Sequence, residues 1–387
     1  MPSVYADLHI HIGSTDSGRP VKNSASKDLT LSNLLKGSRD QKGMDLVGVI
    51  DAHVPEILNQ LEQDLESGKA RELPGGGIRY QGITLLLGSE IEIREEGRKP
   101  FHLLSYLPTF KKMKEFSNYL SKGMKNPHLS SQRFNRSTRE LQEATKELGG
   151  LFIPAHIFTP HKGILSAVNR LEEVCDPKHI DAVELGLSGD TEMADHLPEL
   201  RNYPFLTNSD AHSIQKIGRE YQRICLQNPD FQSLRLALKR EGGNFIEANY
   251  GLNPSLGKYY RSRCSHCGER VEPYQSRCSQ CGGPVAKGVF DRVLELGEKE
   301  ALHPDWRPPY FPQILLEFFP GVGKKTYLRL IEAFGNEMNL LHRVPIREIK
   351  EKFGPTLAER IQLSRENRLP IEAGGGGMYG KVDKDLL

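Results

Sequence analysis

Histidines and acids recur along the first 250 residues, at or just beyond the ends of short apolar segments. They are Asp7, His9, His11, Asp51, His53, Glu90, His102, His156, Asp210 and His212. A spacing of two places both members of a pair on one face of an extended segment. Because the carboxyl ends of strands in a parallel barrel meet at one mouth, we expect these side chains to converge. A lone histidine at a strand end is usually an ordinary rim residue, but recurrence on nearly every segment favours a joint metal site.

The same part of the chain alternates short segments rich in Val, Ile and Leu with longer amphipathic ones, which is typical of repeated strand and helix units. Strands are expected at residues 4–11, 46–53, 83–93, 101–107, 151–156, 182–187 and 205–210. Helices are expected at residues 33–42, 56–67, 133–148, 166–174 and 231–240. Seven strands suffice for a barrel, so we predict an α/β fold built on a (β/α)7 barrel.

This set of side chains also indicates which metals bind. Imidazole and carboxylate together suit zinc, manganese or iron, and so many ligands exceed what one tetrahedral ion uses. We therefore expect two or three adjacent divalent metals. Such clusters favour hydrolysis of phosphate esters, because they lower the pKa of a water molecule and neutralise phosphoryl oxygens. Asp7 is expected to orient a ligand rather than to coordinate.

Four of the six cysteines form two Cys-x-x-Cys pairs, Cys264 with Cys267 and Cys278 with Cys281. Four thiolates with no open position describe a structural zinc site, and a glycine after each pair lets the backbone turn toward sulfur. Many such ribbons only brace neighbouring domains. The alternative is contact with a phosphate backbone through nearby basic and aromatic residues, which are Lys258, Tyr259, Tyr260, Arg261, Arg263, Arg270, Tyr274 and Arg277.

Residues 315–335 fit a helix-hairpin-helix motif in a small all-α domain. Gly321 and Gly323 permit a tight turn of the backbone. The amides of the following helix, with Lys324 and Lys325, would then bind phosphate without regard to base sequence. The alternative is a plain helix pair with a glycine-rich turn. Residues 353–361 are interpreted as a degenerate second copy of this motif.

Changes in composition along the chain indicate the domain boundaries. A linker is expected at residues 253–257, and prolines at 304, 308, 309 and 312 interrupt regular structure. We predict a metal-dependent hydrolase barrel at 1–255, a zinc-binding domain at 256–290 and a helical domain at 291–387. The glycine-rich residues 374–377 are expected to be flexible.

Charge and hydropathy restrict the partners. The formal net charge is +2, so any basic surface that binds nucleic acid must be local. No apolar run is long enough to span a bilayer, and the first residues lack the pattern of a signal peptide. A cytoplasmic protein without a membrane partner is expected.

The ligand pattern resembles that of the PHP (polymerase and histidinol phosphatase) family. The family motifs are matched by His9 and His11, by Asp51 and His53 around Ala52, by Glu90, His102 and His156, and by Asp210 and His212, with Asp16 where a further ligand follows. The resemblance implies a distorted seven-stranded α/β barrel holding three metals. Ala52 departs from the family pattern, which leaves the role of Asp51 open.

The order of barrel, four-cysteine ribbon and helical domain resembles the endonuclease Q family over essentially the whole chain. The resemblance implies incision of single- or double-stranded DNA on the 5′ side of uracil, hypoxanthine, xanthine or an abasic site, with zinc, manganese or magnesium in the barrel and replication or repair proteins as further partners. The catalytic residues would be His9, His11, Glu90, Asp210 and His212.

Recognition of a deaminated base requires a pocket with one hydrogen-bond donor and one acceptor. The candidates are Ser188, Gly189 and Asn208, for which the alternative is an ordinary loop role. Three other functions stay open: a PHP-type exonuclease, a phosphoesterase acting on monoesters, and a module that binds damaged DNA without cutting it.

Overall fold

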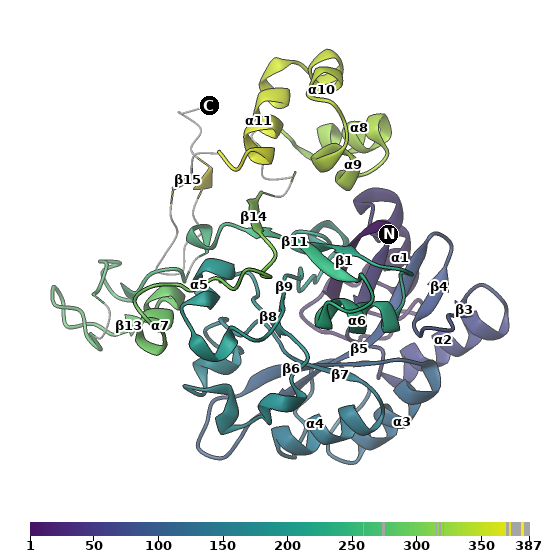
Figure 1. Ribbon diagram of the computed structural model, residues 1–387, viewed down its shortest axis with the longest axis horizontal. Coiled ribbons are helices and arrows are strands. Elements are labelled where there is room, and N and C mark those ends of the chain that lie inside the picture. Colours follow the sequence, from purple (N-terminus) through teal and green to yellow (C-terminus); the bar gives the residue numbers. More distant parts are fainter. Residues whose placement is uncertain are drawn as a thin grey trace. The chain divides into compact units, whose positions relative to one another are not determined.

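The structure is a computed structural model that describes residues 1–257, 259–272, 275–314, 316, 319, 321–368, 371–372 and 381–382. Two compact units divide the chain (Figure 1). The first comprises Met1–Gly186 and Asn202–Asn249, and the second comprises Leu187–Arg201 and Tyr250–Leu387. The predicted division into three domains at residues 255 and 290 stays a prediction.

The first unit is built on a mixed, strongly curved sheet. Its main path runs β11 (Phe245–Leu252), β10 (Tyr221–Cys225), β1 (Ser3–Ile10), β2 (Leu46–Val49), β5 (Ile83–Ile93), β4 (Ile78–Tyr80) and β3 (Arg71–Glu72). From β5 the sheet also continues through β6 (Phe101–Leu107) to β7 (Leu151–Pro154). A separate parallel pair consists of β8 (Val183–Glu184) and β9 (Phe205–Leu206).

The strand directions differ from those of a uniformly parallel barrel. Strands β1, β2 and β5 pair in parallel, whereas β1 with β10, β5 with β6, and β6 with β7 pair antiparallel. The amino-terminal end of β6 therefore lies beside the carboxyl-terminal end of β5. The expectation that the ligands meet at the carboxyl ends of parallel strands was wrong for β6, because His102 lies near the amino-terminal end of this strand.

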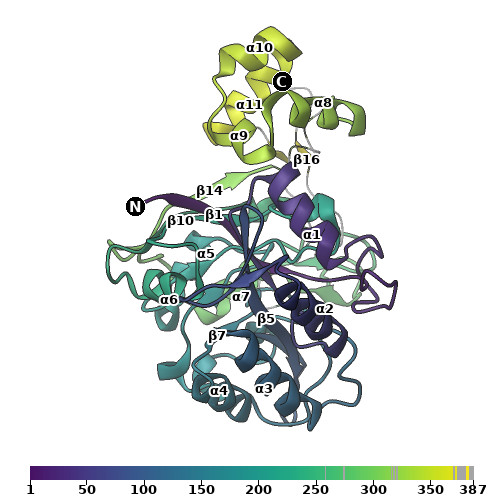
Figure 2. The same cartoon turned by 90° about the vertical axis from the view of Figure 1, so that its right-hand side faces the viewer.

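Helices cover the outer face of the sheet, with α3 (Phe110–Ser121) against β6 and α4 (Thr138–Glu147) against β6 and β7 (Figure 2). The remaining helices of this unit are α1 (Leu31–Gly37), α2 (Pro55–Glu66) and α6 (Phe231–Lys239). Apolar residues of the strands and of α6 bury a continuous core that includes Leu8, Leu46, Leu86, Leu104 and Ile153. Burial of this apolar surface is the main stabilising contribution of the barrel.

Two helix predictions need correction. The helix expected from residue 133 begins at Thr138, because Ser137 and Glu140 close a capping box there. No α-helix spans residues 166–174: two short 3-10 helices stand at Ile164–Ser166 and Leu171–Glu173, and the Glu173 carboxylate accepts from the backbone amides of residues 169 and 170. Helix α3 was not predicted.

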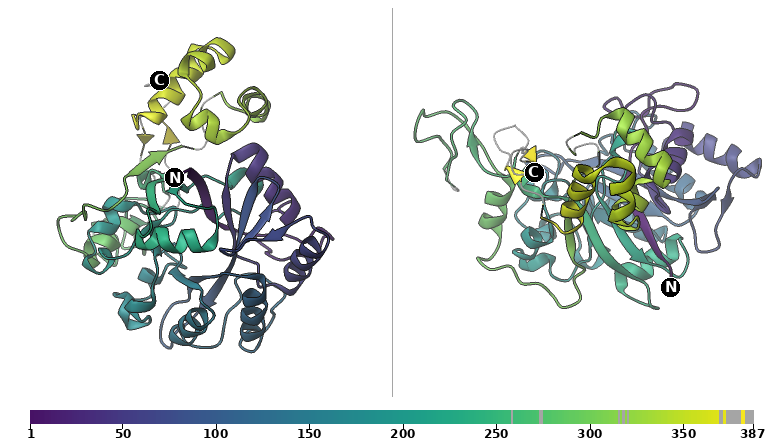
Figure 3. Two further views of the ribbon diagram at one scale, coloured as in Figure 1. Left: turned by 45° about the vertical axis from the view of Figure 1, so that its right-hand side comes forward. Right: turned by 90° about the horizontal axis from the view of Figure 1, so that it is seen from above.

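The second unit contains α5 (Thr191–Asp195), β12 (Arg263–Cys264), β13 (Val285–Ala286), α7 (Val289–Leu296), β14 (Tyr310–Gln313), β15 (Ile371–Glu372) and β16 (Lys381–Val382). Its last helices are α8 (Lys324–Phe334), α9 (Glu337–His342), α10 (Ile346–Phe353) and α11 (Pro355–Arg365), which form one group (Figure 3). They pack on a common cluster that includes Leu316, Leu330, Phe334, Leu340 and Ile361. None of the helices in the described part of the chain has the length and apolar character needed to cross a membrane.

Candidate metal centre

Three groups of potential ligands lie together in the first unit. They are His9, His11 and Glu90; His11, Asp210 and His212; and Glu90, His102 and His156, and within each group the ligand atoms lie within 4.8 Å of one another. His11 belongs to two groups, and so does Glu90. Seven of the nine predicted ligands in the barrel therefore form one connected set.

Glu90 joins two of these groups because its two carboxylate oxygens face different histidines. Oε1 lies 2.8 Å from His102 Nδ1 and 3.2 Å from His156 Nε2. Oε2 lies 3.4 Å from His11 Nε2. A carboxylate with oxygens directed to two groups has the geometry of a bridging ligand.

Buried carboxylates orient the first two histidines. Glu184, at the end of β8, lies 3.0 Å from His9 Nδ1, and Asp51 lies 3.2 Å from His11 Nδ1. Each contact leaves Nε2 of the ring directed toward the other ligands, the arrangement in which a carboxylate holds a metal-binding imidazole. The uncertain role of Asp51 is thereby assigned, and Glu184 is an orienting residue that the sequence reasoning missed, although it ends a predicted strand like the ligands themselves.

Asp7 acts through the backbone instead of through a ligand side chain. Its carboxylate accepts from the amides of His9, Ser209 and Gly218, at 3.4, 3.1 and 2.9 Å. Burial raises the pKa of Asp7 to about 6. The residue ties the end of β1 to the segment that precedes Asp210.

His53 and Asp16 stand outside the three groups. His53 is buried, and neither of its ring nitrogens has a hydrogen-bond partner among the described residues. Burial lowers the pKa of His53 to about 4, so the ring is neutral, as a metal ligand must be. Asp16 is partly exposed and accepts from Ser32 and Gln60, both at 2.5 Å. Its predicted ligand role has no geometric support in this structure.

The backbone is strained at two of the ligands. His156 has φ +28° and Asp210 has φ +46°, backbone conformations that residues other than glycine rarely adopt. Gly186 packs so closely against His156 that an added Cβ would lie 2.5 Å from the His156 Cβ. Strain of this kind persists where the surrounding structure holds a residue for function.

Electrostatics favour the metal-binding protonation state of the carboxylates. Burial by itself would raise the pKa of Glu90, but the charges of His102 and Lys22 outweigh it and hold the pKa well below its usual range. The pKa of Asp210 is likewise lowered, because a hydrogen bond from His11 and the charge of His9 oppose burial. Both carboxylates are ionised at neutral pH.

The donor set fits divalent metals. The ionised Glu90 and Asp210, and histidines directed by buried carboxylates, are hard and borderline donors suited to zinc or manganese. Asp210 and His212 retain side-chain exposures of 28% and 32%, whereas the other ligands of the groups are buried. Within the first unit, Asp210 and His212 are therefore the most exposed members of the three groups.

The predicted lesion-pocket residues fall in different surroundings. Asn208 is fully buried, its Oδ1 accepting from the Leu8 amide and from Gln222 at 2.9 Å and its Nδ2 donating to Glu184 at 3.3 Å. This side chain braces the framework of the barrel, so its assignment to the pocket is corrected. Ser188 and Gly189 lie in the turn before α5, two and three residues after Gly186, the neighbour of His156.

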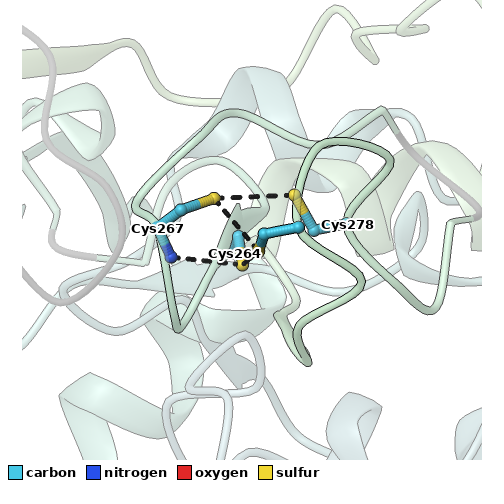
Figure 4. Close-up of side chains that lie close together, drawn as sticks. Cys264, Cys267 and Cys278 are labelled. Atoms are coloured by element: carbon cyan, nitrogen blue, oxygen red, sulfur yellow. Dashed lines mark hydrogen bonds between the residues drawn. The ribbon is translucent and has the colours of Figure 1, made fainter.

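The four cysteines of the ribbon form a fourth ligand group (Figure 4). The Sγ atoms of Cys264 and Cys281 lie 3.4 Å apart, and those of Cys267 and Cys278 lie 3.6 Å apart. Gly268 and Gly282 have positive φ, and the amides of Cys267 and His266 lower the pKa of the Cys264 thiol to about 6. The group that these four sulfurs form includes no further histidine or carboxylate of the described residues, which is typical of a closed structural site. His266 is not a member of it.

The C-terminal helices partly follow the predicted hairpin. Gly321 has φ +86°, Gly323 precedes α8, and Lys324 and Lys325 are exposed in its first turn. Gly354, with φ +89°, separates α10 from α11 at the position of the predicted second copy. Residues 315, 317, 318 and 320 of the first hairpin lie outside the described residues, as do Lys258, Tyr274 and the glycine-rich stretch 374–377.

Comparison with known proteins extends these observations to the whole chain. No protein-family profile matches the sequence. The uncharacterized protein YqxK of Bacillus subtilis is 50% identical over 386 residues, which cover 99% of this chain and 100% of YqxK. The uncharacterized protein MJ0043 of Methanocaldococcus jannaschii is 39% identical over 247 residues, which cover 58% of this chain and 31% of that protein.

Two solved structures match the fold over nearly its full length. The lesion-specific endonuclease PfuEndoQ from Pyrococcus furiosus superposes with a TM-score of 0.85 at 31% identity, covering 98% of this chain and 95% of PfuEndoQ. Endonuclease Q in complex with a 27-mer duplex that carries an abasic lesion superposes with a TM-score of 0.84 at 31% identity, covering 100% and 98%.

The α/β fold and its linked histidine and carboxylate groups, together with these two matches, define a metal-dependent DNA endonuclease. Likeness to endonuclease Q extends beyond the barrel to the cysteine ribbon and the C-terminal helices. The chain belongs to the endonuclease Q family. The predicted family, fold class and nuclease class are confirmed.

Proposed function

We propose that this protein incises DNA on the 5′ side of uracil, hypoxanthine, xanthine and abasic sites, by hydrolysis at a centre of two or three divalent metals. The observation that carries this function is the linkage of three ligand groups through His11 and Glu90, in a chain that matches PfuEndoQ along its length. The endonuclease Q complex, which holds a duplex with an abasic lesion at its active site, supports DNA as the substrate.

The ligand groups divide the work of such a centre. Bound metals would activate a water molecule and neutralise the phosphoryl oxygens. Glu184 and Asp51 orient the imidazoles of His9 and His11 before substrate arrives. The exposed edge at Asp210 and His212 admits the phosphodiester. Zinc, manganese and magnesium remain the candidates for the barrel, and zinc for the four cysteines.

Selectivity for a lesion requires that the target nucleotide leave the helix. Mispaired uracil and hypoxanthine cost less to extrude than paired normal bases, and hydrogen bonding must supply the rest. Ser188 and Gly189, in the turn before α5, are the proposed recognition residues. Lys324 and Lys325 would hold the flanking phosphates without regard to sequence.

A set of end-labelled duplexes tests this function against its alternatives. Purified protein is incubated with zinc, manganese or magnesium and with DNA that contains one deoxyuridine, one deoxyinosine, one abasic site or no lesion. The proposal predicts one cut in each damaged duplex and none in the undamaged one. A 3′ ladder would instead indicate an exonuclease, release of inorganic phosphate alone a monoesterase, and binding without cleavage a damage-binding module.

A further inference from the structure

A lysine lies beside the metal-ligand groups without belonging to them. Lys22 Nζ is 3.3 Å from Glu90 Oε2 and donates to Ser131 Oγ at 2.5 Å. Its side chain is only 13% exposed. Ser131 in turn donates to the same Glu90 oxygen, and the neighbouring Ser130 Oγ lies 3.2 Å from His11 Nδ1. The ammonium group is therefore directed at the ligands.

Backbone contacts fix the lysine and the serines in place. The Ser130 amide donates to the Val21 carbonyl at 2.8 Å, which joins the two loops that carry Ser131 and Lys22. The Val21 amide donates to the carbonyl of Gly13 at 2.9 Å, and Gly13 lies two residues after the ligand His11. Ser131 has φ +50°, an unfavourable conformation for serine that commonly marks a functional position. These backbone hydrogen bonds hold Lys22 and Ser131 in fixed positions beside the ligands.

The Lys22 ammonium group pairs with Glu90, a carboxylate that is also expected to coordinate the metals. Glu90 is the one carboxylate that pairs with Lys22 in the part of the chain that the structure describes. The same carboxylate belongs to two ligand groups, so a bound ion draws on its charge. A largely buried ammonium without an anionic partner is costly. The anion that the reaction brings to this place is the phosphate of the substrate.

We propose that Lys22 is a catalytic residue that binds a non-bridging oxygen of the scissile phosphodiester and stabilises the charge that builds there during hydrolysis. Ser131 is a positioning residue, since its hydroxyl accepts from Nζ and holds the lysine at the centre. The inference rests on the proposed hydrolytic function and adds a group that is not a metal ligand. No bond to the lysine forms or breaks, because it acts by charge and hydrogen bonding.

Inorganic phosphate provides a probe that does not depend on lesion cleavage. Phosphate is titrated calorimetrically into metal-loaded wild-type protein, Lys22→Met and Lys22→Arg, with metal content measured on each sample. Lys22→Met is expected to keep its metals and to bind phosphate about 10-fold more weakly, the value of a charge-assisted hydrogen bond, with binding largely restored in Lys22→Arg. The matched control is Lys69→Met, which removes an exposed lysine that pairs with Asp64.

Incision kinetics provide the second readout. Loss of one preorganised donor is expected to lower kcat by about 100-fold in Lys22→Met, with a smaller change in KM. Ser131→Gly removes the hydroxyl while glycine tolerates the positive φ, and it is expected to lower kcat less than Lys22→Met does. Lys69→Met should cleave as the wild type.

The outcomes separate this inference from the proposed function. Unchanged phosphate affinity and unchanged kcat in Lys22→Met would overturn it, and so would loss of metal from that variant, since Lys22 would then support the ligands rather than the substrate. Wild-type protein that binds phosphate through Lys22 yet leaves damaged DNA uncut would support the phosphate contact of Lys22, but it would refute the proposed lesion-specific incision and with it the role of Lys22 in that reaction.

Discussion

His102 Nδ1 lies 2.8 Å from Oε1 of Glu90 because β6 runs antiparallel to β5. Glu92 lies opposite His102 in the register of the two strands, so the start of β6 meets the end of β5 at the same edge of the sheet. The two residues thus supply one ligand group from strands of opposite direction. This pairing links the group of Glu90, His102 and His156 to the group of His9, His11 and Glu90 through a single carboxylate.

Loss of one ligand should separate catalysis from DNA binding. His11→Ala or Asp210→Asn is expected to abolish cleavage, since His11 belongs to two groups and Asp210 is one of the two carboxylates among them. DNA affinity should stay within a few-fold of wild type, because the proposed contacts to the flanking phosphates, through Lys324 and Lys325, belong to the second unit and are not altered. Gel incision assays and fluorescence anisotropy measure the two properties. His128→Ala, at an exposed histidine that pairs with Glu56, is the control. Cleavage near the wild-type rate in either ligand variant would refute the assignment.

The orienting carboxylates should matter nearly as much as the ligands. Glu184→Gln and Asp51→Asn keep shape but remove the charge that holds His9 and His11, so metal affinity or activity is expected to fall by about 10- to 100-fold. Metal titration of the purified variants measures the effect. Glu62→Gln, at an exposed ion pair with Lys114, should change nothing. An equal affinity in Glu184→Gln and Glu62→Gln would contradict the role given to Glu184.

Much of the centre could be predicted from the sequence, since alternation on a strand fixes which side chains share a face. His9, His11, Glu90, His102, His156, Asp210 and His212 were all predicted and all fall in the three groups. Strand direction could not be read from the residues, because apolar runs of β5 and β6 look alike whether they pair parallel or antiparallel.

The missed residues depend on contacts far apart in the sequence. Glu184 is separated from His9 by 175 residues, and no local pattern reports that pair. Asn208 looks like an open loop residue, yet the structure buries it among Leu8, Gln222 and Glu184. Ser131 and Lys22 carry no motif at all, and only their approach to Glu90 gives them a role.

Removal of Lys324 and Lys325 should weaken DNA binding uniformly across sequences. Both are exposed in the first turn of α8, where the amides are free of a capping side chain. Replacement of both by alanine is expected to reduce the slope of log affinity against log salt by about 2, since each phosphate contact contributes slightly less than one. The double substitution to arginine, which keeps the charges, is the control. An unchanged slope would reduce the hairpin to a structural role.

The four cysteines should bind one zinc ion that is separate from the metals of the barrel. Cys278→Ser is expected to lose one equivalent of zinc and to destabilise the ribbon, because Cys278 is buried with Cys264 and Val271 in its small core. Elemental analysis and the spectrum of the cobalt-substituted protein measure this loss. Cys225→Ser, at a buried thiol outside the group, is the control. Zinc content equal in both variants would contradict a four-cysteine site.

The most direct test maps the cut on a duplex that contains a single deoxyuridine and is labelled at the 5′ end of the damaged strand. With divalent metal the account predicts one product that ends in a 3′-hydroxyl immediately before the deoxyuridine, a 5′-phosphate on the other fragment, and no product from the undamaged duplex, from chelator-treated protein or from His11→Ala. A cut elsewhere, a ladder from the 3′ end, or equal cutting of undamaged DNA would contradict lesion-specific incision at this metal centre.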